Sequence, residues 1–178
     1  MHPRFRSATL LLLCSCLAAS AADHLVLRGS GLRTKPILGT MYELKLLVPE
    51  TLRTAEAPAL IEADQPMEFV LAIQSRLITR ARFVEATTEG FAKAAGAGYA
   101  SDQTGPFNAQ FDGVEFKRGD VITMRWAEGQ LTTLYKSGET ETTLGTLPGL
   151  DLKKALFAIW LGGAPVQESL KKALLGAP

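Results

Sequence analysis

Three side chains that could do chemistry lie close together early in the chain: Arg33, Tyr42 and Lys45. The guanidinium of arginine stays charged at any relevant pH and can hold a carboxylate or a phenolate through two parallel hydrogen bonds. Tyr42 and Lys45 could supply an acid or a base, although a packed tyrosine and a solvated lysine are the commoner roles. Arg33 has a second interpretation, an ion pair with Glu43 or Glu89. From the sequence alone, Arg33 could therefore either bind an anion or form a local ion pair.

Other familiar catalytic and cofactor motifs are missing from the sequence. Both cysteines, Cys14 and Cys16, lie in the first 22 residues, and His24 is the only histidine beyond them. A thiol nucleophile, a histidine-based triad and a metal site of cysteine or histidine are therefore excluded from the remainder. Ser30 lacks a G-x-S-x-G context, and its neighbouring glycines form neither a dinucleotide fingerprint nor a P-loop. We expect a protein without cofactor or metal.

The first residues have the pattern of a secretory signal. Two arginines precede an apolar run, and a small-x-small motif allows cleavage after Ala21 or Ala22. The apolar run is too short to span a bilayer. A lipobox-like sequence leaves a second possibility, a lipoprotein anchored at Cys16. We expect residues 1–22 to be a signal peptide and residues 23–178 to form a single periplasmic or secreted domain.

Charge and length exclude further classes of protein. The 178 residues carry a formal net charge of +1, and the chain contains no basic block. Such a domain lacks the electrostatic footprint of a nucleic-acid-binding protein. No segment after the signal is long and apolar enough to cross a membrane. The chain is long enough for one substantial core.

Alternating apolar residues predict several strands. The clearest case is Met67 to Gln74, and Val121 to Leu147 has the turns of a three-stranded meander. Two earlier strands are expected over 25–28 and 37–48, separated by a turn at Gly29-Ser30-Gly31. Antiparallel strands followed by grouped helices favour an α+β fold over a parallel βαβ design.

Helix signals are strongest near the end of the chain. Asp151 is in the position of an N-cap, Gly162-Gly163 ends the helix, and Pro165 suits the first turn of a second helix that closes at Gly176. An earlier helix is expected from Thr79, as its cap, to about Gly96. Residues 97–113 are expected to form a loop or a broken helix, and residues 50–64 a connection with at most a short irregular helix.

Several segments together resemble the chalcone isomerase-like family, in its exported bacterial branch. They are an early Gly-x-Gly-x-Arg segment, the helix start, a Lys-Arg-Gly-Asp segment before a strand, and the C-terminal helix pair. In this chain they are residues 29–33, 79–91, 117–126 and 155–176. The C-terminal pair is the specific part, because a Gly-x-Gly-x-Arg segment alone is weak support.

The resemblance implies an open-faced β-sandwich, in which a large curved antiparallel sheet is covered on one face by a layer of helices. It also implies a ligand cleft between sheet and helices. Plant members close a flavonoid ring there, and a plastid branch holds fatty acids with an arginine meeting the carboxylate. Arg33 matches that arginine, and Tyr42 and Phe83 are expected beside it in the ligand site. The expected ligand is a small apolar or amphipathic molecule.

The catalytic residues of the plant enzymes do not carry over. The resemblance places Phe83 at the catalytic tyrosine, Gly90 at an active-site asparagine and Ile159 near a hydroxyl residue. Loss of one positioned donor typically costs about 10²–10³ in rate. The first hypothesis is therefore a non-catalytic binder of a fatty acid or similar apolar anion. The alternatives are an isomerase (an intramolecular lyase) with an unknown substrate, and an interaction protein whose cleft is closed by side chains.

Overall fold

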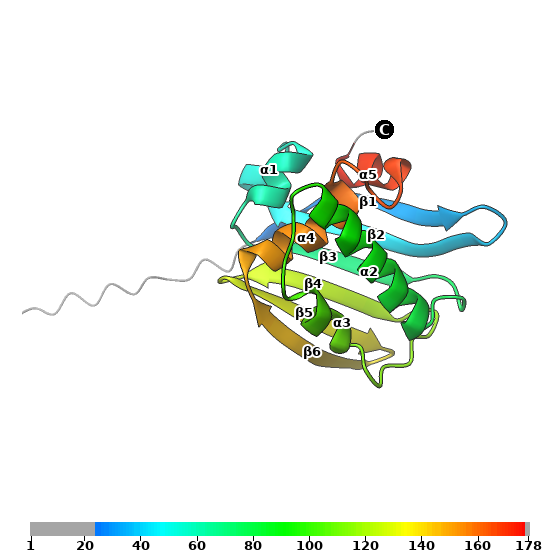
Figure 1. The fold of residues 1–178 in the computed structure, drawn as a ribbon. Helices are drawn as coiled ribbons and strands as arrows, with labels where there is room; N and C mark the ends of the chain where they lie inside the picture. The colour runs from blue at the N-terminus through cyan, green and yellow to red at the C-terminus, as the bar shows by residue number, and fades with distance from the viewer. Residues whose placement is uncertain (1–23, 177–178) are drawn as a thin grey trace, which may run out of the picture.

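A single antiparallel sheet forms the framework of the molecule (Figure 1). The computed structural model describes residues 24–176. Each strand pairs with the next one along the chain, so that the order across the sheet is β1-β2-β3-β4-β5-β6. The strands are β1 (Leu25–Lys35), β2 (Gly39–Pro49), β3 (Met67–Ile73), β4 (Val121–Ala127), β5 (Gln130–Ser137) and β6 (Thr140–Pro148).

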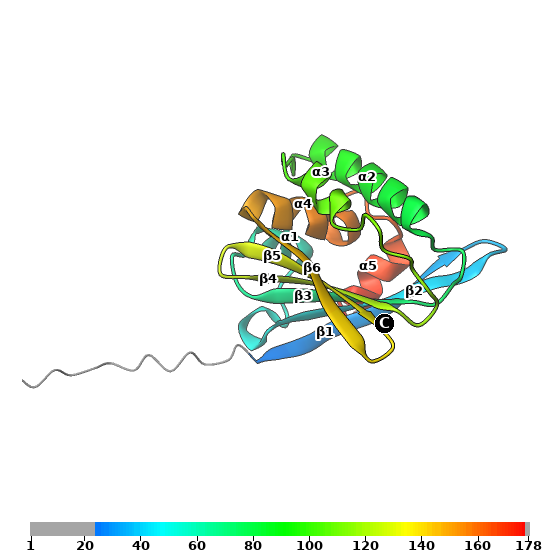
Figure 2. The same cartoon turned by 90° about the horizontal axis from the view of Figure 1, so that it is seen from below.

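The helices lie on one face of this sheet, and Figure 2 shows the two layers from the side. Their bounds are η1 (Glu50–Leu52), α1 (Ala57–Glu62), α2 (Arg80–Gly96), α3 (Thr104–Ala109), α4 (Leu150–Leu161) and α5 (Glu168–Leu174). The predicted α+β class and the open-faced β-sandwich are confirmed. Within residues 24–176, no helix is long and apolar enough to cross a membrane.

The core lies between the sheet and helix α4. Strand β3 alternates buried and half-buried residues along its whole length, as the sequence pattern predicts. Helix α4 is buried on nearly all sides, from Leu152 to Leu161, which is more than the single apolar face that its spacing predicts. The Phe69 ring lies 4.5 Å from the Phe157 ring and 5.0 Å from the Trp160 ring, measured between centroids. The centre of the molecule is therefore a packed aromatic core.

The predicted turn at Gly29-Ser30-Gly31 is wrong. Strand β1 continues through these residues, and the chain reverses at 36–38. A Cβ on Gly29 would collide with the backbone oxygen of Ala173, and one on Gly31 would lie 2.7 Å from the Ala173 Cβ. The two glycines therefore let α5 pack directly on β1, and their role is close approach between elements.

The ends of the last two helices also differ from the prediction. Gly149 occupies the N-cap of α4, and Asp151 lies inside the first turn, where its negative charge still suits the helix dipole. Helix α5 begins only at Glu168, with Gln167 as its N-cap, so Pro165 precedes the helix. The Thr79 cap is confirmed, since its hydroxyl accepts a hydrogen bond from the backbone N–H of Arg82.

The two uncertain stretches contain short helices. Residues 97–113 include α3, and residues 50–64 include η1 and α1. The predicted signal peptide, with its two cleavage positions and the possible lipid site at Cys16, lies outside the described residues and stays a prediction.

Candidate functional site

Arg33 lies on β1, and its side chain points toward the helix layer. Its Nη1 atom donates to the Thr34 carbonyl at 2.7 Å and to Oε1 of Gln167 at 2.9 Å. The backbone N–H of Thr34 also donates to the same Gln167 oxygen at 3.0 Å. The half-buried guanidinium is thus held between the sheet and the start of α5.

The charge of Arg33 is not neutralised by the described residues. Within residues 24–176, no carboxylate lies within salt-bridge distance of its guanidinium, so the alternative ion pair with Glu43 or Glu89 does not form. Both carboxylates have lysine partners, since Glu43 lies 3.7 Å from Lys45 and Glu89 lies 2.7 Å from Lys93. The Lys93 hydrogen bond is the main cause of the lowered pKa of Glu89, and the positive charge of Arg33 contributes a smaller part. Arg33 therefore faces α2 as an unpaired cation.

Tyr42 lies directly opposite Arg33 on the neighbouring strand. Its hydroxyl accepts a hydrogen bond from Nε1 of Trp160 at 3.0 Å. Burial raises the pKa of Tyr42 to about 12, although the Trp160 hydrogen bond and the charge of Arg33 act in the opposite direction. Tyr42 is therefore neutral at physiological pH and keeps its own proton for donation, which suits a binding group better than a base.

Phe83 lies in a different cluster. Its ring contacts Phe111 at 4.8 Å and Phe116 at 5.3 Å between centroids, both in edge-to-face geometry. This aromatic cluster fixes the start of α2 to the loop that precedes β4. The structure thus brings Arg33 and Tyr42 together and places Phe83 in the packing of another part of the helix layer.

Comparison with known proteins identifies the family and the fold. The profile of the family described as chalcone isomerase-like matches residues 17–176. The chain belongs to the chalcone isomerase-like family. The crystal structure of a fatty-acid binding protein from Arabidopsis thaliana is similar, with a TM-score of 0.66 and 21% sequence identity over 88% of this chain and 89% of that one. At this identity the likeness shows the fold. No curated protein matches the chain.

In this chalcone isomerase-like protein, two positions that the resemblance links to catalysis contact each other. A Cβ on Gly90 of α2 would lie 2.9 Å from Cγ2 of Ile159 on α4. Ile159 therefore occupies the space next to the bare backbone of Gly90, and the two helices pack closely there. Where the resemblance leads one to expect an amide and a hydroxyl that could stabilise developing charge, the structure has one apolar contact.

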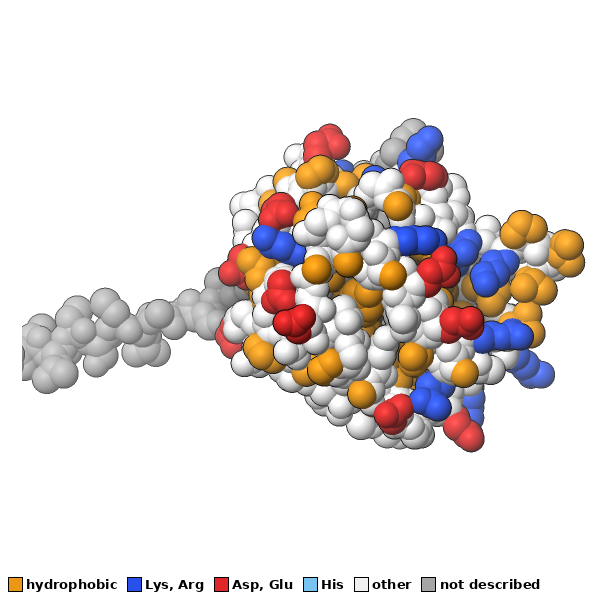
Figure 3. Space-filling view, in the orientation of Figure 1, with side chains coloured by type: hydrophobic (Ala, Val, Ile, Leu, Met, Phe, Trp, Pro, Cys, Tyr) orange, Lys and Arg blue, Asp and Glu red, His pale blue; other side chains and the backbone are white. Residues whose placement is uncertain are grey.

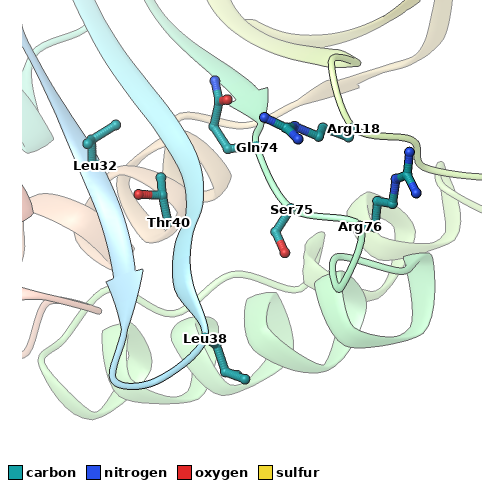
Figure 4. A pocket seen from close by; sticks show the side chains of 7 residues that line it. All are labelled: Leu32, Leu38, Thr40, Gln74, Ser75, Arg76 and Arg118. Carbon is teal, nitrogen blue, oxygen red and sulfur yellow. The ribbon is translucent and has the colours of Figure 1, made fainter.

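Two surface hollows lie elsewhere, and Arg33 lines neither of them. The larger, of about 640 Å³, is lined by Leu32, Leu38, Thr40, Gln74, Ser75, Arg76 and Arg118 (Figure 4). Because successive residues of a strand point to opposite faces, Leu32 faces away from the helices while Arg33 faces them. The other hollow, of about 360 Å³, lies between α2 and the residues around α3.

Sequence reasoning missed Arg76 and Arg118. Arg118 stands in the Lys-Arg-Gly-Asp segment that contributes to the resemblance, but that segment was assigned no role. Arg76 follows β3 in a loop and has no motif around it. Only the antiparallel pairing of β3 with β4 brings the two loops to one end of the sheet.

Proposed function

We propose that this protein binds a fatty acid or a similar apolar anion without catalysis, and that Arg33 holds the anionic group. The observation that carries the proposal is the unpaired charge of Arg33. Its guanidinium is half-buried against the helix layer and donates only to neutral oxygens of Thr34 and Gln167.

The remaining donors of Arg33 support this proposal. Its Nε and Nη2 atoms donate no hydrogen bond to the described part of the chain, so they are available to a carboxylate. Hydrogen bonds between charged groups are roughly twice as strong as neutral ones. The neutral hydroxyl of Tyr42 stands on the paired strand. A carboxylate at this edge of the helix layer would meet a cation on one side and a hydroxyl donor on the other.

The fold of the family adds a second line of support. A fatty-acid binding protein with the same fold shows that this architecture is compatible with such a ligand. The ring-closing alternative needs positioned donors in the cleft, and at Gly90 and Ile159 it would find an apolar contact. The one amide beside Arg33 is already engaged, since Nε2 of Gln167 donates to Ser169 at 2.6 Å and to the Leu32 carbonyl at 3.3 Å.

Calorimetric titration of the delipidated protein with dodecanoate tests the proposal. We expect Arg33→Gln to weaken binding by about 10- to 100-fold, because a hydrogen bond to a charged group contributes about 1.5–3 kcal/mol. Arg53→Gln is the matched control, since Arg53 is an exposed arginine paired with Glu50 beyond the far end of β2.

A neutral ligand separates the anion site from general apolar binding. Dodecanol should bind the wild-type protein and the Arg33→Gln variant equally. If dodecanoate binds both proteins equally, or if neither binds it and native mass spectrometry of the protein as isolated finds no lipid, the proposal is wrong.

A further inference from the structure

One end of the sheet is rich in basic residues, and of these Arg80 is paired with a neighbouring carboxylate, Asp112, at 2.8 Å. Three segments meet there: the β1–β2 turn with its flanking residues (31–40), the loop after β3 (74–82) and the turn before β4 (117–119). We call this region the basic end. All of its charged residues are basic, and they are Arg33, Lys35, Arg76, Arg80, Arg82, Lys117 and Arg118. This clustering is notable in a chain whose formal net charge is only +1.

The basic end also exposes large apolar side chains. Leu32 is 49% exposed, Leu38 51%, Leu77 39% and Ile37 fully exposed at 104%. Leu27, near the opposite end of β1, is the other large hydrophobic residue of the described chain with comparable exposure. In the space-filling view, hydrophobic side chains cover the tip of the β1–β2 hairpin, and lysine and arginine side chains lie around them (Figure 3). Apolar groups rimmed by charge mark an interaction surface.

Ile37 is held in an unfavourable backbone conformation at this tip. Its φ is 68°, in the left-handed region that glycine adopts easily and a β-branched residue rarely adopts. The side chain gains no burial in return, since it is fully exposed. Folding alone would favour glycine or asparagine at this position. The observed isoleucine therefore points to a role outside the folded chain.

The arginines of the basic end line the larger hollow (Figure 4). In that view Arg118 extends toward Gln74, and Arg76 lies beside it. Among residues 24–176, Arg76 and Arg118 have neither a salt-bridge partner nor a hydrogen-bond acceptor. Thr40 and Ser75 add hydroxyl groups to the lining, so that several donors face one hollow.

The position of Arg118 is fixed by the turn around it. The backbone N–H of Lys117 donates to Oδ2 of Asp120 at 2.7 Å, and that of Gly119 donates to the Ile73 carbonyl at 2.8 Å. Gly119 has a φ of 97°, which glycine adopts without strain. Tyr135 donates a further hydrogen bond to the buried carboxylate of Asp120. The Lys-Arg-Gly-Asp segment thus presents Arg118 from a rigid turn.

We propose that the basic end docks on an anionic membrane surface. The apolar hairpin tip enters the boundary between headgroups and acyl chains, and Arg76 and Arg118 receive lipid phosphates in the hollow behind it. Apolar residues flanked by lysine and arginine are typical of proteins that lie at such a boundary. A protein partner would normally match charge of both signs, whereas an anionic leaflet matches three adjoining segments that contain seven basic residues and no acidic one.

Co-sedimentation with lipid vesicles tests this inference. Two kinds of vesicle are used, phosphatidylcholine alone and phosphatidylcholine mixed with phosphatidylglycerol, both free of fatty acid. We expect binding to the phosphatidylglycerol vesicles only, weakening as salt is added. Arg76→Gln combined with Arg118→Gln should lower the partition coefficient roughly thirtyfold, since each basic residue near an anionic surface contributes about a fivefold step.

Matched variants separate the basic end from general stickiness. Ile37→Asn with Leu38→Asn should also lose binding, whereas Leu27→Asn and Arg53→Gln, at the other end of the hairpin, should keep it. Circular dichroism melting shows that each variant is folded. The inference is overturned if both kinds of vesicle bind equally, if neither binds, or if the control and basic-end variants behave alike.

Inorganic phosphate distinguishes a free-anion site from a membrane site. We expect millimolar phosphate to compete no better than chloride at equal ionic strength. Selective competition by phosphate would show that the hollow takes a small anion, which would overturn membrane docking. Because the vesicles contain no fatty acid and the protein is delipidated, failure here leaves the proposed ligand site at Arg33 untouched.

Discussion

The middle of strand β1 and its far end are built in opposite ways. In the middle, Gly29 and Gly31 carry no side chain, and α5 rests on the bare backbone. A few residues later, Leu32 and Ile37 are large, apolar and exposed. Along β1 and the turn that follows it, the smallest residues lie where another element covers the sheet, and large apolar residues lie where nothing in the described chain covers it. The covered part is shaped for packing, and the uncovered part is shaped for contact with something else.

Two basic side chains, Lys153 and Arg118, differ in a similar way: one is satisfied inside the protein and the other is exposed. Lys153 on α4 is fully buried, and its Nζ donates to the carbonyls of Leu60 at 2.6 Å, Ile61 at 2.9 Å and Ala63 at 2.8 Å. These oxygens are at the C-terminal end of α1, where helical carbonyls lack partners. Lys153 thus satisfies all its donors inside the protein, whereas Arg118 is exposed and satisfies none within residues 24–176. The difference separates a structural cation from one available to a ligand.

The largest effect should come from adding a side chain under α5. We expect Gly29→Ala to lower the free energy of unfolding by about 3 kcal/mol, the upper part of the range for overpacking, because the new methyl group meets backbone atoms that cannot rotate away. Urea unfolding measures this. Gly105→Ala is the control, since no atom lies within 4 Å of a Cβ there. Equal midpoints for the two variants would show that α5 does not depend on the glycine.

Removal of the Lys153 donors should have the next largest effect. Burial lowers the pKa of Lys153 to about 7, against the opposing field of Asp64. The unfolded chain has an ordinary lysine pKa of about 10.4 and therefore binds more protons than the native state between about pH 7 and 10. The free energy of unfolding should therefore rise with pH between about pH 7 and 10. Below about pH 7 it should not depend on the protonation of Lys153.

Lys153→Met should lose this rise, because methionine does not titrate. We expect the variant to be about 2 kcal/mol less stable than the wild type at pH 9, since the α1 carbonyls lose their donors. The difference in stability between the variant and the wild type should narrow toward pH 7, because Lys153 becomes protonated there and the wild type then carries a buried charge. Urea unfolding across this pH range measures it. Lys154→Met is the control, since Lys154 is less buried and its pair with Glu62 is half exposed. Parallel pH curves for wild type and Lys153→Met would contradict the assignment.

Local sequence patterns were sufficient for most of the framework. The alternation in β3, the Thr79 cap of α2 and the meander β4–β6 all depend on neighbours in the chain, and the structure confirms them. Gly29 and Gly31 show where such patterns fail. Glycine serves both in turns and where two backbones approach closely, and only the position of α5 decides between them.

The candidate sites depend on contacts between distant residues. Arg33 meets Gln167, which is 134 residues away, and Arg76 and Arg118 meet through the pairing of β3 with β4. Lys153 follows the same rule, since it stands beside Lys154 in what looks like a solvated pair, and its partners lie about 90 residues earlier. The family resemblance pointed to Arg33, and Tyr42 and Phe83 were expected beside it, but the sequence assigned nothing to the basic end. The basic end could be recognised only once the strand pairing of the sheet was known.

The smallest effect concerns the hairpin tip itself. A non-glycine residue in left-handed backbone loses about 1–2 kcal/mol of stability. Glycine removes this strain but loses more conformational entropy on folding, which offsets part of the gain. We expect Ile37→Gly to raise stability by roughly 0.5 kcal/mol, and Glu128→Gly, at the other described non-glycine residue with positive φ (52°), to do the same. Differential scanning calorimetry measures both. Only Ile37→Gly should also weaken binding to anionic vesicles. A destabilised Ile37→Gly would mean that Ile37 serves the fold, and the contrast between the covered and uncovered parts of β1 would then be lost.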